Sequence, residues 1–237
     1  MNDLLQILIK LAAALLPALF LGLYIWKKDP KPEPTNQLIK AVLLGVGLCL
    51  PVAFVELIIQ KGLFGFSGGQ PFTLFGTTVE AFFVAAIPEE AAKLLALWII
   101  LRKNPYFDEH FDGIVYAVCV GLGFAAIENV FYVFGSEDWL STAVARSFLA
   151  VPGHYAFGII MGYYYSVYHF VDRSKKYKTL ILLAPVMAHG VYDSLALSGT
   201  VNATVGGLSF FVLIFFCIKM QRQAQRRVKE LVAKDKK

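Results

Sequence analysis

The chain is 237 residues long, and with 57% hydrophobic and 16% charged residues it has the composition of a membrane protein. About 135 apolar residues suffice for six or seven bilayer-spanning helices of roughly 20 residues each, which excludes a sizeable soluble domain. The net charge of +5 could indicate a nucleic-acid partner, so the positions of the basic residues decide its meaning.

Apolar runs of helical length predict an all-α, polytopic membrane fold with about seven transmembrane helices. Residues 1–219 are expected to form one transmembrane domain, followed by a basic cytoplasmic tail at 220–237. Gly158 and Gly162 form a small-xxx-small step that lets their helix approach a neighbour closely. In chain order, the predicted spans are 4–26, 41–60, 73–101, 112–135, 143–170, 179–198 and 205–219.

Lysine and arginine residues orient these spans, because cytoplasmic connections carry the excess of positive charge. Of the 22 basic residues, 18 lie in alternate connections, within residues 27–40, 102–103, 173–178 and 219–237. The N-terminus is therefore predicted outside and the C-terminus in the cytoplasm. The basic excess is explained by topology, so no nucleic-acid partner is expected.

Ionisable side chains within the predicted spans are the candidate functional residues. A charge at mid-membrane costs about 2.5 to 3.5 kcal/mol, and such residues by default face the bundle interior and serve a function. Several separate spans contribute them. In chain order they are Glu56, Glu80, Glu89, Glu90, Lys93, Glu128 with the neighbouring Asn129, His154, His189 and Asp193.

The third predicted span is the richest in these residues. Pro88 suits the first turn of a helix, and acidic residues favour that turn, so the sequence predicts a break and a new helix start here. Glu89 and Glu90 precede Lys93 by four and three residues, so the lysine can reach either carboxylate. Two adjacent carboxylates titrate as a coupled group, which suits a general base. The structural alternative is a buried ion pair between helices.

Histidines provide the other candidates. His189 and Asp193 lie four residues apart on one helix face, so the carboxylate can orient the imidazole. His154 follows Pro152 and Gly153, which predicts a helix interruption of the kind tolerated beside a cavity.

The predicted spans also give the depth of each candidate. At about 1.5 Å of rise per residue, five of them reach the middle-to-outer half of the bilayer: Glu89, Glu128, His154, His189 and Asp193. A water-filled cavity that opens outward would reach them.

Peptide hydrolysis by an activated water molecule fits this set of residues. It needs a carboxylate base and donors for a developing oxyanion. Glu89 and Glu90 are candidate bases, and His189, His154 and Asn129 are candidate donors. The chain has no HExxH sequence, which argues against a zincin-type protease.

A metal-free mechanism is preferred, with no cofactor expected. Lys93 beside the carboxylates would compete with a bound cation. The alternative is zinc or another divalent metal, whose ligands would then be Glu89, Glu128, His154 and His189.

Four short motifs, in their order along the chain, resemble the PrsW family of bacterial membrane proteases over about residues 75–200. The motifs are Glu89-Glu90-x-x-Lys93, Phe124-x-x-x-Glu128-Asn129, the helix with His154, and His189-x-x-x-Asp193. The PrsW family is related to the CAAX prenyl protease and ABI superfamily. In that superfamily the first motif ends in arginine and the second has histidine in place of glutamate, so the departures favour the PrsW branch.

The resemblance implies an intramembrane endopeptidase of the bacterial plasma membrane. It would make the extracytoplasmic, site-1 cut in a single-pass membrane anti-sigma factor during envelope stress. Its partners are then this substrate and the lipid bilayer. The resemblance implies that Glu89 and Glu90 are the essential acidic pair and that Glu128 positions the water. His189 and Asp193 would complete the site, with His154 as a further member. Lys93 and Asn129 would have supporting roles.

Two other classes of function remain alternatives. A proton-coupled transporter or channel also uses mid-membrane carboxylates and interrupted helices. Inverted repeats would favour it, and the sequence has none that we can recognise. A non-enzymatic scaffold or sensor would have little use for so many buried acids.

Overall fold

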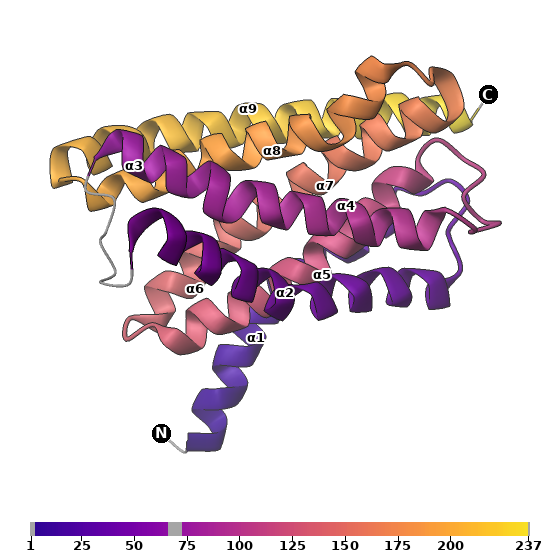
Figure 1. The fold of residues 1–237 in the computed structure, drawn as a ribbon. Helices are drawn as coiled ribbons and strands as arrows, with labels where there is room; N and C mark the ends of the chain where they lie inside the picture. The colour runs from indigo at the N-terminus through magenta and orange to yellow at the C-terminus, as the bar shows by residue number, and fades with distance from the viewer. Residues whose placement is uncertain (1–2, 66–72, 237) are drawn as a thin grey trace.

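The computed structural model describes residues 3–65 and 73–236, and all regular structure within these ranges is helical (Figure 1). The expected all-α class is thereby confirmed. The elements are α1 (Asp3–Trp26), α2 (Thr35–Phe64), α3 (Leu74–Val79), the π-helix η1 (Glu80–Ala86), α4 (Ile87–Leu101), α5 (Asp112–Gly135), α6 (Trp139–Phe148), α7 (Ala150–Ser166), the π-helix η2 (Val167–Val171), α8 (Lys175–Leu197), the 3-10 helix η3 (Ser198–Thr200) and α9 (Ala203–Asp235).

Six helical segments in the described ranges are long and apolar enough to cross a membrane. The third predicted span, 73–101, is not among them, because it holds four charged residues, Glu80, Glu89, Glu90 and Lys93. The other predicted spans each overlap one of the six. These are Asp3–Trp26, Thr35–Phe64, Asp112–Gly135, Trp139–Val171, Lys175–Thr200 and Ala203–Asp235.

Helix α5 lies at the centre of the bundle and packs against α1, α2, α4, α6 and α7. Every residue from 112 to 125 is buried. A side chain added at Gly158 or Gly162 of α7 would meet the α5 backbone at Val118 or Gly113. The predicted small-xxx-small step is therefore confirmed, and the helix that it admits is α5.

Helix α9 does not end where the seventh span was expected to end. It continues to Asp235 as one long helix (Figure 1). The side chains of Met220, Ala224, Val228 and Leu231 are buried in the same core as α5 and α7. Their three- and four-residue spacing places them on one face. In the described residues, the segment expected as a basic tail is thus a helical arm packed on the bundle.

The two expected helix interruptions take different forms from those predicted. At Pro88 the backbone stays helical: the π-helix η1 runs directly into α4, and the Ile87 amide donates to the Phe82 carbonyl, five residues back. The interruption near His154 lies at Leu149, between α6 and α7, where φ is −118° and ψ is −62°. Pro152 consequently falls in the first turn of α7, where its missing amide proton is not needed.

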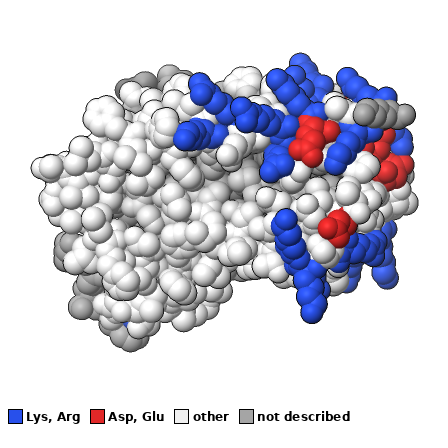
Figure 2. All heavy atoms as spheres, turned by 90° about the horizontal axis from the view of Figure 1, so that it is seen from above, with Lys and Arg blue, Asp and Glu red and all other residues white. Residues whose placement is uncertain are grey.

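Basic side chains gather at one end of the molecule, with a few acidic ones among them, and the rest of the face in Figure 2 shows almost no charged groups. This is the end where α1 and α4 finish and where α2, α5 and α8 begin (Figure 1). The alternate connections that carry the positive charge therefore share one end, as the predicted topology requires.

Candidate active site

The first two turns of α4 carry the predicted acidic pair and its lysine. Glu89, Glu90 and Lys93 are buried, with 4%, 0% and 3% of their surface exposed. The Lys93 Nζ atom lies 2.8 Å from Glu89 Oε2 and 2.8 Å from Glu90 Oε1. Because residues three and four apart share a helix face, one ammonium group reaches both carboxylates.

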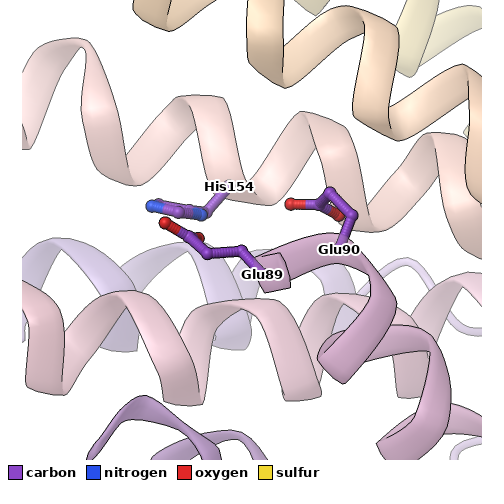
Figure 3. Close-up of side chains that lie close together, drawn as sticks. All are labelled: Glu89, Glu90 and His154. Carbon is purple, nitrogen blue, oxygen red and sulfur yellow. The ribbon is translucent and has the colours of Figure 1, made fainter. Parts of the chain in front are cut away.

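His154 of α7 completes the surroundings of the ammonium group. Lys93 Nζ is 3.1 Å from His154 Nδ1, so each of its three protons has an acceptor. The Nδ1 atom then accepts, and the proton on Nε2 is donated to Glu128 Oε2 at 2.9 Å. Figure 3 shows the His154 ring beside the Glu89 carboxylate, with Glu90 next to them.

His189 of α8 lies between two carboxylates. Its Nδ1 is 2.9 Å from Glu90 Oε1, and its Nε2 is 3.1 Å from Asp193 Oδ2. A ring protonated at both nitrogens donates to both. Its position is fixed by the Phe157 ring, stacked at a centroid distance of 4.6 Å. At the adjacent Gly190, an added side chain would meet the Phe82 ring, so this glycine lets η1 pack on α8.

Arg146 of α6 belongs to the cluster and was not among the predicted site residues. Its Nη2 donates to Glu128 Oε2 at 2.7 Å and its Nε to Asn129 Oδ1 at 2.6 Å. The guanidinium group also lies 3.9 Å from the centroid of the Tyr132 ring. The sequence did contain a signal, because Arg146 is one of the few basic residues outside the four basic connections.

Asn129 has a different place from the one expected of an oxyanion donor. Its amide Nδ2 donates to the Ala14 carbonyl of α1 at 2.8 Å, and the residue is 0% exposed. The side chain therefore ties α5 to α1 and orients Arg146.

A cavity of about 630 Å³ lies against this cluster. Glu90, Lys93 and Asn129 are not part of its wall and lie behind it. Its far part is lined by the end of α2 and the end of α8, for example at Gln60 and Leu197, on the side away from the basic connections. The polar and ionisable residues of its wall are Glu56, Gln60, Glu80, Glu89, Glu128, Tyr132, Arg146, His154, His189, Tyr192 and Asp193.

A metal site can be tested against the same geometry. Glu89, Glu90 and His154 each offer a ligand atom within 4.8 Å of the others. Their chemistry suits a transition metal, but the Lys93 ammonium lies within hydrogen-bond distance of all three side chains. The arrangement therefore does not fit a metal ion while Lys93 is in place. The predicted alternative ligands Glu128 and His189 are not in this group.

The comparisons with known proteins agree on one family. A family profile described as "PrsW family intramembrane metalloprotease" matches residues 33–220. The chain is 35% identical over 206 residues to Protease PrsW of Oceanobacillus iheyensis, covering 86% of this chain and 90% of the relative. It is 31% identical over 218 residues to Protease PrsW of Geobacillus kaustophilus, covering 91% and 92%.

Protease PrsW of Bacillus subtilis is 34% identical over 186 residues, covering 77% of this chain and 80% of the relative. No solved structure matches the chain. The bacterial relatives and the six apolar helices identify a multi-pass protein of the bacterial plasma membrane. A match over most of its length shows that the chain belongs to the PrsW family of intramembrane proteases.

Proposed function

We propose that this protein is an endopeptidase in which Glu89 activates water as a general base. One observation carries the assignment: of the two adjacent carboxylates on α4, Glu89 lines the cavity, whereas Glu90 lies fully buried behind it. Glu90 then serves as a positioning residue, since its Oε1 contacts both Lys93 and His189. General-base catalysis requires this combination of an accessible carboxylate and fixed surroundings.

Charge balance supports a carboxylate base in this cluster. Four carboxylates, those of Glu89, Glu90, Glu128 and Asp193, face three cationic groups. The cations are Lys93, Arg146 and a doubly protonated His189. One carboxylate therefore has no counter-charge of its own and is available to accept a proton.

In the proposed reaction, the water oxygen attacks the carbonyl carbon of the substrate peptide while Glu89 accepts a water proton. The tetrahedral intermediate then collapses with cleavage of the C–N bond, and Glu89 returns the proton to the leaving amine. Arg146, in the cavity wall, is the donor available to the oxyanion, because its guanidinium group keeps N–H groups beyond those that contact Glu128 and Asn129. His189 donates both of its N–H groups to Glu90 and Asp193, so it can contribute its positive charge but no further hydrogen bond.

We propose that no metal takes part, although the family description contains the word "metalloprotease". Support comes from Lys93, whose positive charge lies between the carboxylates and the imidazole that would otherwise bind the ion. A chelator is therefore expected to leave cleavage unchanged.

For the topology, we propose that α3, η1 and α4 together form a seventh crossing. The basic end of the molecule would be cytoplasmic and the N-terminus outside. The far part of the cavity lies at the opposite end, near Gln60 and Leu197, which supports an extracytoplasmic cut. A single-pass membrane anti-sigma factor as substrate rests on the resemblance to the family, as does the relation to the CAAX prenyl protease and ABI superfamily.

The test uses purified protein in liposomes with a membrane-anchored peptide that bears a short external segment. We expect cleavage by the parent and by Glu137→Gln, which changes an exposed acid in the connection after α5. Glu89→Gln, Glu90→Gln and His189→Ala should each lose it, and mass spectrometry of the products locates the cut. Full cleavage by all three variants contradicts the proposal. A parent that moves ions but cuts nothing favours a transporter.

A further inference from the structure

A second group of acids lies at the basic end of the molecule, remote from the cavity. It is formed by the connection before α2, the connection before α5 and the first residue of α5. Glu33 accepts a hydrogen bond from the Tyr116 hydroxyl, and Asp108 pairs with Lys31 at 2.7 Å on the exposed side. The remaining members are Asp29, Glu109 and Asp112. Each of them has one buried carboxylate oxygen without a hydrogen-bond partner among the described residues.

Two of the three unpartnered oxygens belong to side chains whose other oxygen is held by backbone amides. Asp29 Oδ1 accepts from the Lys31 amide, and Asp112 Oδ2 accepts from the amides of Asp108 and Glu109. Asp29 Oδ2, Glu109 Oε2 and Asp112 Oδ1 are buried without a hydrogen-bond partner among the described residues. Asp112 is 0% exposed and Asp29 is 7% exposed.

These three carboxylates lie close together with little positive charge to offset them. Each offers one ligand oxygen within 4.8 Å of the others. Lys31, the lysine paired at this cluster, is 63% exposed and directed to Asp108. Buried carboxylates that face one another without a cation are strongly unfavourable.

We propose that Asp29, Glu109 and Asp112 bind a hard divalent cation of the Ca²⁺ or Mg²⁺ class. Carboxylate oxygens are the ligands that such ions prefer. Oxygens bound at about 2.3 to 2.6 Å on opposite sides of a Ca²⁺ ion would lie about 5 Å apart, so oxygens within 4.8 Å of one another can share one ion. The site is separate from Glu89 and does not depend on the proposed function.

A bound ion would join three parts of the chain. Asp29 comes from the connection before α2, and Glu109 and Asp112 from the connection and helix start at α5. The neighbouring His110 and Phe111 amides donate to Asp235 of α9 at 2.9 and 2.8 Å. Ion binding is therefore expected to stabilise the packing of the α9 arm.

The test measures binding of radioactive Ca²⁺, and its competition by Mg²⁺, to the chelator-treated full chain in detergent. We expect one ion per chain and a rise of a few degrees in the midpoint of thermal unfolding. Asp112→Asn and Glu109→Gln should each lose the ion and the rise. Asp172→Asn, an exposed acid at the same end, and Glu89→Gln, at the other cluster, should keep both.

Two results would overturn the proposal. One is a folded parent that binds neither ion, in which case the buried carboxyl groups hold protons instead. The other is equal binding by the parent, Asp112→Asn and Glu109→Gln. Glu109 is only partly buried, so its amide variant keeps the test valid if Asp112→Asn does not fold.

Discussion

Lys93 is the residue that holds the polar cluster together. Its ammonium group is almost fully buried and contacts two carboxylates and one imidazole. Removal of the lysine leaves the acidic pair buried without a counter-charge, and such uncompensated charges are costly.

We therefore expect Lys93→Met to lower the free energy of unfolding by about 3 to 5 kcal/mol and to abolish cleavage. Added zinc should not restore activity, because the lysine supplies the positive charge itself. Thermal unfolding and the liposome cleavage assay measure the two effects, and Lys103→Met, at an exposed site, is the control. Activity of Lys93→Met that returns with zinc would contradict the metal-free site.

Asp29 gives the protein a pH-dependent stability. Burial, reinforced by the Glu109 carboxylate, raises the pKa of Asp29 to about 6 from its ordinary value of 3.8. Since the folded pKa is the higher one, its stabilising contribution is present at low pH and is lost as the pH rises through about 6.

With a chelator present, the midpoint of thermal unfolding should thus fall as the pH rises from about 4 to about 6, and the Asp29 contribution should change little above that range. Asp29→Asn should fall less over this window, whereas Asp172→Asn should follow the parent. Identical profiles for the parent and Asp29→Asn would show that this carboxyl group does not titrate in the window.

The sequence predicted most residues of the polar cluster but not all of their contacts. Ionisable residues in apolar segments are visible from sequence, so Glu89, His154 and His189 could be named. Arg146 was missed because a single basic residue near a helix end also fits an interfacial position. The turn of Asn129 toward α1 depends on packing between distant helices, which no local pattern encodes.

Among the helices, the close contact between α5 and α7 positions the site, because α7 carries His154. We expect Gly162→Ala to destabilise the protein by about 1 to 3 kcal/mol, since the added methyl group meets the Gly113 backbone. Cleavage should fall as well.

Gly47→Ala is the matched control, because nothing lies within 4 Å of a side chain added there. It should be neutral or slightly stabilising, as alanine favours helix over glycine. Thermal unfolding compares the two, and equal midpoints for both variants would count against a tight α5–α7 contact.

The α9 arm, the part of α9 after residue 219, is expected to contribute to the stability of the fold. Truncation after residue 219 removes buried side chains such as Val228 and Leu231, and each contributes about 1.5 to 3 kcal/mol. The midpoint of thermal unfolding should drop markedly. The triple variant Arg222→Gln, Arg226→Gln and Lys229→Gln alters only the exposed face and should unfold near the parent.

If truncation leaves the midpoint unchanged, the segment is the solvated tail that its basic residues suggested. The prediction of a basic tail counted charges along the chain and did not consider which face of a helix each residue occupies. The apolar residues Met220, Ala224, Val228 and Leu231 lie on one face of the helix. The Lys and Arg residues between them dominate the composition of the segment, so composition alone does not reveal this face. Pro88 is a similar case. The local chemistry of proline predicts a break in the helix, whereas the π-helix η1 accommodates Pro88 within a continuous helix.

For the whole molecule, hydropathy and charge predicted a helical membrane bundle with basic connections at one end. The third predicted span is the exception, since its composition is set by the ionisable residues that it carries. A cavity bounded by residues between Ala53 of α2 and Leu213 of α9 could not be predicted, because its walls are residues distant in sequence. The resulting molecule is a bundle whose cavity reaches from the polar cluster to the end away from the basic connections.

The most direct test of this account is the single-turnover cleavage rate of Glu89→Gln in chelator-treated liposomes, with Glu137→Gln as the matched control. We predict that Glu89→Gln is slower than the parent by about 10² to 10⁴-fold while its thermal unfolding is nearly unchanged, and that Glu137→Gln cleaves at the parent rate. Cleavage by folded Glu89→Gln at the rate of the parent would contradict the assignment of Glu89 as the base.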